Sequence, residues 1–206
     1  MLMDTLKKLL SVYGPTGQES AVAQAIQAML AGHADSMRTD VMGNLIVEKK
    51  GQPGGKTLMF SAHMDHIGLV VTAIEDTGYL RVTSVGGVSL DMSQTRHVVF
   101  GNGVEGVVAL QPTKGETPTL DHLFVDIGAA DRAEAETMVA PGDVCVYAPD
   151  FFQLGQHRVA SPAMDDRCAC ALLCELVLAL ETPRNTVTAV FSTQEEVGLR
   201  GAATAA

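Results

Sequence analysis

The sequence predicts an α/β fold, a mixed sheet sandwiched by helices, with an inserted β-barrel-like domain. Near both ends of the chain, amphipathic helices alternate with short, nearly continuous apolar strands, as in a sheet layered with helices. From about residue 68 to residue 157 the pattern changes to closely spaced short strands, which is typical of a small barrel or sandwich. We therefore expect one domain from residues 1–67 and 158–206, and a second domain from residues 68–157.

The first third of the chain predicts two helices and two strands. Leucines recur at helical spacing within residues 2–10. The turn GPTGQES leads to a second helix that begins at Glu19 or Ser20 and continues to about residue 34. A strand follows at 41–50, then the turn GQPGGK, and then TLMFSA at 57–62, an apolar run of the kind found in strands buried on both faces.

The inserted region contains short strand candidates and one helix candidate at 131–138. The strand candidates are 69–74, 79–85, 97–100, 104–110, 123–129 and 143–151. After the insert, residues 165–181 predict a helix and residues 185–193 another buried strand. The last nine residues, GLRGAATAA, include what reads as the first turns of a further helix.

Composition and charge exclude several classes of partner. The 206 residues are 47% hydrophobic, which is ample for a packed core, and 14 Lys and Arg against 24 Asp and Glu give a net charge of −10. Such a charge opposes binding to nucleic acid or to an anionic membrane. The N-terminal helix lacks the unbroken apolar stretch of a signal peptide, and the apolar segment 171–180 is too short to span a bilayer. We expect a cytoplasmic protein with neither nucleic acid nor membrane as a partner.

Three of the four cysteines lie close together in the pattern C-x-C-x-x-x-C, which raises the question of a metal site. On a helix, Cys170 and Cys174 share a face but Cys168 does not. Small buried thiols in a reducing compartment explain the cluster, and Cys145, better than metal ligation does.

Polar side chains follow two of the buried strands. His63 and Asp65 come directly after TLMFSA, and residues two apart on an extended backbone project to the same side. The carboxylate of Asp65 can then orient the imidazole, as carboxylates do behind metal-binding histidines. Glu195 and Glu196 follow the strand at 185–193. Taken alone, each pair also fits solvated charges at the end of a strand.

We expect these pairs to converge on one site, because ligand sites form beyond the carboxyl ends of strands in an open, mostly parallel sheet. Asp165 and Asp166 open the next helix, where acidic residues also serve as caps. One imidazole and several carboxylates suit a pair of divalent cations that activate water. Neighbouring side chains on an extended backbone point apart, so one of Glu195 and Glu196 can bind metal while the other acts as a general base.

The chain resembles a known family along nearly its whole length. The motifs GPTGQE, DVMGNLIV, SAHMDHIGLVV, FVDIGA, APGDVCVYAPDF, MDDRCACALL and STQEEVGLRGA occur in this order. They resemble the glutamyl/tetrahedral aminopeptidase family of cytosolic co-catalytic metallopeptidases. The resemblance implies a zinc-peptidase-like α/β domain that hydrolyses N-terminal residues from short peptides.

The resemblance also implies roles for five residues. His63 would bind one metal, Glu196 the other, and Asp165 would bridge both, while Glu195 would be the general base and Asp65 would orient His63. It implies two divalent metal ions per full-length subunit. Zinc is the first expectation, with cobalt or manganese as alternatives because a mixed imidazole and carboxylate shell accepts several divalent ions.

Two further implications concern assembly and the backbone. In this family the β-rich insert helps to build homo-oligomers, up to a tetrahedral dodecamer. Related co-catalytic peptidases often have a cis peptide bond at the bridging aspartate, here between Asp165 and Asp166. We therefore expect a homo-oligomer and a cis bond at this position.

The chain departs from the family pattern in two places. His66 stands where these enzymes usually have Glu, and we do not expect it to be a ligand because it should point away from Asp65. The family continues past STQEEVGLRGA with a further Asp ligand and a later His ligand, so we expect a C-terminal truncation that leaves weak metal binding and little or no activity. Two alternatives stay open: a non-catalytic fragment that only self-associates, and a dinuclear-metal amidohydrolase or deacetylase of non-peptide substrates.

Overall fold

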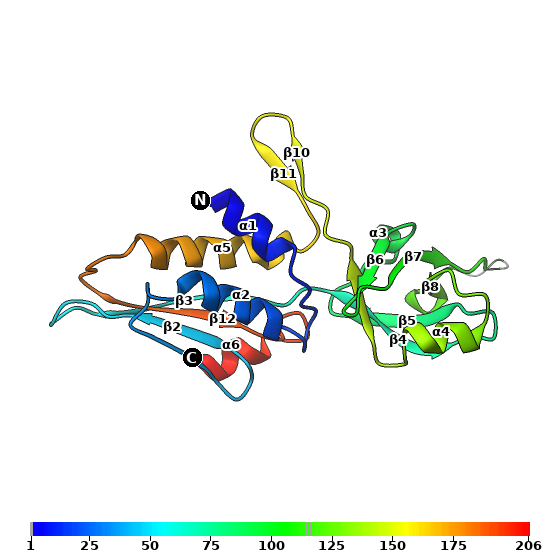
Figure 1. The fold of residues 1–206 in the computed structure, drawn as a ribbon, viewed down its shortest axis with the longest axis horizontal. Coiled ribbons are helices and arrows are strands. Elements are labelled where there is room, and N and C mark those ends of the chain that lie inside the picture. The colour runs from blue at the N-terminus through cyan, green and yellow to red at the C-terminus, as the bar shows by residue number, and fades with distance from the viewer. Residues whose placement is uncertain (1, 114, 116) are drawn as a thin grey trace. The chain divides into compact units, whose positions relative to one another are not determined.

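The structure, a computed structural model, describes residues 2–113, 115 and 117–206 and divides into two compact units (Figure 1). Unit 1 contains the residues up to His66 together with Pro149–Ala206, and unit 2 contains Ile67–Ala148. Unit 2 thus begins within one residue of the start expected for the insert. Residues 149–157, which the sequence assigns to the insert, group with unit 1.

Unit 1 contains a four-stranded mixed sheet. In spatial order its strands are β1 (Ser36–Thr39), β2 (Leu45–Lys49), β12 (Thr186–Ser192) and β3 (Thr57–His63). Strand β12 runs parallel to β3 and antiparallel to β2, so the expected mixed sheet is confirmed. The sequence did not predict β1, because this short edge strand is mostly exposed and has the polar composition SMRT.

Strand β3 differs from the expectation in one respect. The sequence predicts a strand buried on both faces, but residues 57–61 are exposed and only Ala62 and His63 are buried. The reason is position: within the described residues β3 is an edge strand whose only neighbour is β12. In β2, by contrast, the three residues Leu45, Ile46 and Val47 are all buried.

Four helices accompany this sheet. They are α1 (Leu2–Leu10), α2 (Ser20–Leu30), α5 (Met164–Ala179) and α6 (Arg200–Ala205). Helix α5 packs against β3 and β12, α1 and α2 pack against α5, and α6 packs against β12. Helix α2 ends before the expected residue 34, because the chain leaves helical geometry at Ala31 and Gly32 adopts a φ of 79°. The buried apolar residues of α1, α2, α5 and the sheet form one hydrophobic core.

The strand expected at 143–151 is shorter in the structure, and the next strand begins only after its expected end. Residues Val144–Tyr147 form β9 of unit 2, and β10 (Phe152–Leu154) pairs with β11 (Arg158–Ala160) as a hairpin in unit 1 (Figure 1). Pro149 lies between them, and proline has no N–H to donate to a strand ladder.

Unit 2 is a closed six-stranded barrel, which resolves the choice between barrel and sandwich. Its strands are β4 (Gly68–Ile74), β5 (Leu80–Val85), β6 (His97–Phe100), β7 (Glu105–Leu110), β8 (Leu123–Asp126) and β9. Their order around the barrel is β4-β5-β8-β7-β6-β9, every pair is antiparallel, and β9 closes the barrel by pairing with both β4 and β6.

Alternating side chains fill the barrel. In β7, Gly106 and Val108 are buried while Glu105 and Val107 are exposed. A side chain at Gly106 would meet the Val125 side chain at 2.7 Å, so glycine permits the close approach of β8. The expected helix at 131–138 is confirmed as α4 (Arg132–Met138), and two shorter helical turns, α3 (Leu90–Ser93) and η1 (Leu120–His122), complete the unit.

Among the helices of the described residues, none combines the length and apolar character that crossing a bilayer requires.

Candidate metal centre

The candidate site lies in unit 1, where two parallel strands end side by side. The register of β3 and β12 places His63 opposite Ser192, and Met64 N–H donates to the Ser192 carbonyl at 2.7 Å. The residues that follow each strand are therefore neighbours. This confirms the expectation that His63 and Asp65 lie beside Glu195 and Glu196.

The buried imidazole of His63 has a different environment at each nitrogen. Its Nδ1 lies 3.0 Å from the backbone carbonyl oxygen of Asp65 and 3.4 Å from that residue's Oδ1. Its Nε2 lies 3.1 Å from Asp165 Oδ1 and 3.7 Å from Glu195 Oε2. When both nitrogens carry a proton, Nδ1 donates to the Asp65 carbonyl and Nε2 to Asp165 Oδ1; loss of the Nε2 proton leaves a lone pair there that can bind a metal ion.

The pKa of His63 reflects these neighbours. Burial lowers it, but the hydrogen bond and negative charge of Asp65, with the charges of Glu195 and Asp166, outweigh burial and raise the pKa to about 9. A metal ion at Nε2 would replace a proton there, so the same surroundings that favour an imidazolium also favour a bound cation.

The carboxylate of Asp65 also contacts the loop after β12. It is fully buried, and it accepts hydrogen bonds from Glu195 N–H at 3.0 Å, Glu196 N–H at 3.2 Å and the Thr16 hydroxyl at 2.8 Å. Burial raises the pKa of Asp65, but the hydrogen bonds from His63, from the two backbone amides and from Thr16 outweigh it and lower the pKa. Asp65 therefore joins the end of β3 to the loop that follows β12.

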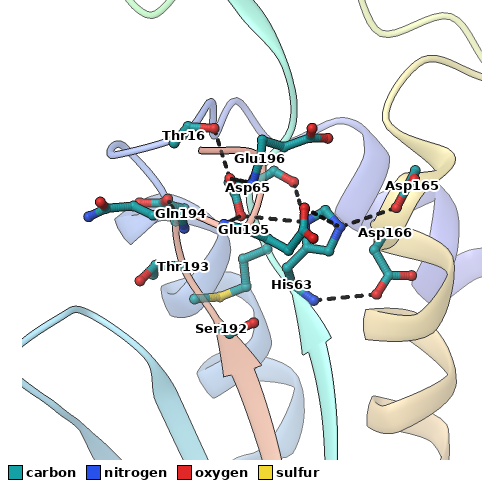
Figure 2. A network of polar contacts seen from close by, with 12 residues as sticks. Thr16, His63, Asp65, Asp165, Asp166, Ser192, Thr193, Gln194, Glu195 and Glu196 are labelled. Atoms are coloured by element: carbon teal, nitrogen blue, oxygen red, sulfur yellow. Dashed lines mark hydrogen bonds and ion pairs between the residues drawn. The ribbon is translucent and has the colours of Figure 1, made fainter. Parts of the chain in front are cut away.

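Asp165 and Asp166 approach His63 from the start of α5 (Figure 2). Neither has helical backbone angles, and the peptide bond between them is cis, as the resemblance implied. Asp165 Oδ1 faces the imidazole while most of its side chain is exposed, and Asp166 Oδ2 accepts a hydrogen bond from His63 N–H at 3.3 Å. These contacts bring both aspartates to the site rather than leaving them only as helix caps.

Glu195 and Glu196 are half-buried, and the Glu195 carboxylate lies against the His63 ring (Figure 2). His63, Glu195 and Glu196 each offer one ligand atom within 4.8 Å of the others, the one such group among the described residues. Burial raises the pKa of Glu196, and the neighbouring carboxylates add to this effect while His63 opposes it. An imidazole and several carboxylates converging in this way fit a divalent cation by donor chemistry.

The other sequence candidates stay outside this group. His66 is buried, and its backbone carbonyl accepts from Thr16 N–H at 3.3 Å, but it is not among the converging ligands. All four cysteines are unpaired, with Cys168 half-buried and the others buried. Cys170 donates to the His63 carbonyl at 3.1 Å, so it packs behind the site as a buried thiol.

Sequence reasoning missed Arg167, the residue after the two aspartates. Its guanidinium is fully buried and donates to four backbone carbonyls, those of Leu9, Val12, Gly14 and Met64. Met64 lies between His63 and Asp65, so this arginine fixes the backbone that presents both. A signal was present: Arg167 lies three and four residues before the buried Cys170 and Ala171, in line with the apolar face of α5.

Comparison with known proteins places this site in a family context. Residues 43–206 match the M42 glutamyl aminopeptidase family. A candidate aminopeptidase of Acetivibrio thermocellus is 41% identical over 207 residues, which cover 100% of this chain and 62% of that protein.

Two solved structures show the same fold. An aminopeptidase of the archaeon Desulfurococcus kamchatkensis matches with a TM-score of 0.93 and 36% identity over 99% of this chain and 59% of that one. The TET1 peptidase of Pyrococcus horikoshii, described as assembling into a tetrahedron or a large octahedral shell, matches with a TM-score of 0.87 and 33% identity, covering 100% of this chain and 64% of that one. The chain thus spans less than two thirds of the length of these relatives.

Proposed function

Because the chain belongs to the M42 glutamyl aminopeptidase family, we propose that it supplies the metal centre of an aminopeptidase that removes N-terminal residues from short peptides. One observation carries the proposal: His63, Glu195 and Glu196 converge at the ends of two parallel strands, with Asp165 against the same imidazole nitrogen. Family membership supports the reaction class, and this geometry supports the location.

The residues divide between metal binding and proton transfer. His63 would bind one divalent ion, Glu196 would bind the other, and Asp165 would contact both, an assignment taken from the family resemblance and supported by the short distance between His63 and Asp165. Zinc is the first expectation, with cobalt and manganese as alternatives. When bound, the two metal ions would supply Lewis-acid activation of water and of the peptide carbonyl.

Glu195 acts as the general base in this proposal. The backbone amide of Glu195 donates to Asp65, and the carboxylate of Glu195 lies 3.7 Å from His63 Nε2. Glu195 therefore lies beside the proposed metal ligands. A base positioned in this way contributes about 10² to 10⁴ in rate. The adjacency of Glu195 and Glu196 lets one short loop deliver both a ligand and a base.

The ligands on the described residues are few for a catalytic centre. His63 and Asp165 would hold one metal, and Asp165 and Glu196 the other, whereas catalytic zinc commonly has three protein ligands. We infer that the 206-residue chain by itself binds metal weakly and turns over slowly or not at all.

Assembly and location complete the proposal. We assign self-association into a homo-oligomer to unit 2, supported by the relative that assembles into closed shells. Four unpaired thiols fit the reducing cytoplasm.

Zinc titration by calorimetry, with hydrolysis of aminoacyl chromophores, tests these assignments. The pair Glu195→Gln and Glu196→Gln provides matched variants, since both remove one carboxylate charge from adjacent positions. We expect Glu196→Gln to weaken zinc binding at least about tenfold and Glu195→Gln to leave it nearly unchanged.

Each part of the proposal can fail separately. No zinc binding by the wild-type chain would refute the metal centre, and equal losses in both variants would refute the division of roles. Rapid peptide hydrolysis by the wild-type chain would refute the expected low activity. Hydrolysis of acetylated amines in place of aminoacyl substrates would favour a deacetylase.

A further inference from the structure

The loop that carries Glu195 and Glu196 is held by side chains from distant parts of unit 1. Four consecutive backbone N–H groups, beyond the last residue of β12, donate to buried side-chain oxygens. Thr193 donates to Asn44 at 2.9 Å, Gln194 to Glu19 at 3.0 Å, and Glu195 and Glu196 to Asp65 at 3.0 and 3.2 Å. The loop therefore takes its shape from three side-chain acceptors instead of from a strand ladder.

One residue in this loop has an unfavourable backbone conformation. Gln194 has a φ of 53°, in the left-handed region that residues with a side chain rarely occupy. Such a conformation persists where the surroundings enforce it. The amide of Gln194 is the one that Glu19 accepts, so Glu19 acts on the residue that turns the chain toward His63 (Figure 2).

Glu19 is well placed to join two loops. It is only 6% exposed and occupies the N-cap position of α2, yet its side chain makes no capping hydrogen bond to that helix. Its Oε1 instead accepts from Gly17 N–H at 2.8 Å and from Gln194 N–H at 3.0 Å. Burying a carboxylate is costly unless it is hydrogen-bonded, and here the bonds go to loops on either side of the site.

The neighbouring groups fix both ends of this arrangement. Thr16, in the same turn as Gly17, donates to Asp65, which ties the turn to the centre of the site. At the other end, Asn44 is fully buried, and its amide nitrogen donates to Asp40 and to the Gly201 carbonyl, which orients its oxygen toward Thr193.

We propose that Glu19 is a positioning residue of the metal centre, which sets the direction of Glu195 and Glu196 through the backbone amide of Gln194. This proposal rests on the proposed function, because it concerns the same centre. Glu19 itself lies outside the converging ligand group and is not a catalytic residue.

Two measurements on the 206-residue chain test this role: hydrogen exchange of backbone amides by NMR, and calorimetric titration with Zn²⁺ alone. In Glu19→Ala we expect faster exchange at Gln194, Glu195 and Glu196, with unchanged exchange in β12. We expect zinc affinity to fall roughly 10- to 100-fold, the range seen when a group that supports metal ligands is removed. Glu19→Gln keeps a carbonyl oxygen to accept both amides, so it should restore most of the affinity.

Leu30→Ala is the matched structural control, because Leu30 is fully buried at the other end of α2 and does not bond to the loop. It should lower the melting temperature without changing zinc affinity. The proposal is overturned if Glu19→Ala leaves both affinity and Gln194 exchange unchanged, or if Leu30→Ala lowers the affinity equally. If Glu19→Ala does not fold, Glu19→Asp replaces it, since a side chain one methylene shorter should fail to reach Gln194.

Failure of the proposed function gives a different result. A wild-type chain that binds no zinc would refute the metal centre, while the exchange rates would still show whether Glu19 holds the loop. Failure of the metal centre and failure of the role of Glu19 can therefore be distinguished.

Discussion

The change Asp65→Asn tests the central claim that one buried carboxylate holds the loop with Glu195 and Glu196. Asparagine keeps the shape of the side chain but replaces one oxygen by an NH₂ group. Asp65 Oδ1 accepts from Glu195 N–H, and Oδ2 accepts from Glu196 N–H and from Thr16. In either orientation of the amide, its NH₂ group faces a backbone N–H, and two donors cannot bond to each other.

The expected loss of stability follows from this count. One buried backbone N–H loses its acceptor, at about 1–3 kcal/mol. The hydroxyl of Thr16 can rotate to accept from an NH₂ group, so it adds nothing to the sum. We expect Asp65→Asn to lower the free energy of unfolding of unit 1 by about 1–3 kcal/mol.

Native-state hydrogen exchange is the suitable assay, because it reports the stability of each unit separately. Amides of β12 report on unit 1, and amides of β8, which should not change, serve as an internal reference. Asp35→Asn is the matched control, since Asp35 is exposed and its carboxylate accepts from Lys50 N–H at the surface, so the loss of stability should stay within about 0.5 kcal/mol. A loss below about 1 kcal/mol for Asp65→Asn would refute the reasoning.

Three further outcomes are expected. Arg167→Met should destabilise unit 1 by more than about 3 kcal/mol in hydrogen exchange, because it leaves four backbone carbonyls without their donor; an effect no larger than that of the exposed Arg38→Met would contradict this. Gly201→Ala should lower stability by about 1–3 kcal/mol, because its Cβ would lie 2.4 Å from the Thr193 carbonyl, whereas Gly87→Ala meets nothing and should be neutral by calorimetry. Iodoacetamide should modify Cys168 before the other cysteines, because it is half-buried while they are buried, and slowly, because burial raises its thiol pKa; mass spectrometry identifies the modified residue. Modification of a buried cysteine first would contradict the packing described for these thiols.

Local pattern was sufficient for much of the fold. Apolar patterning predicted β12 and, within a longer expected strand at 41–50, β2, and the leucine spacing predicted α1. The closure of unit 2 could not be predicted, because it depends on β9 pairing with two strands distant in sequence, β4 and β6. The exposure of β3 was also beyond local pattern, since an apolar run does not specify how many neighbours its strand acquires.

The candidate site divides in the same way. Residues at strand ends, such as His63 and Glu195, are predictable because parallel strands bring their carboxyl ends together. The partners of Asp65 were not predictable, because Thr16 and the backbone amides after β12 meet it only in the folded chain. Glu19 illustrates this limit best: its position before α2 suggested only a helix start, and its bond to Gln194 spans most of the chain.

The strand order of the barrel affects how His63 and Asp165, on either side of the inserted segment, come together during folding. Its first strand, β4, pairs with its last, β9, so that Leu69 lies opposite Cys145 and the two ends of the inserted segment leave the barrel together. Once the barrel is folded, the chain segments next to His66 and Pro149 are held close together, although many residues separate them in the sequence. Since the entropy of loop closure depends on the length of free chain, His63 and Asp165 are joined, in effect, by a brief connection once the barrel has formed.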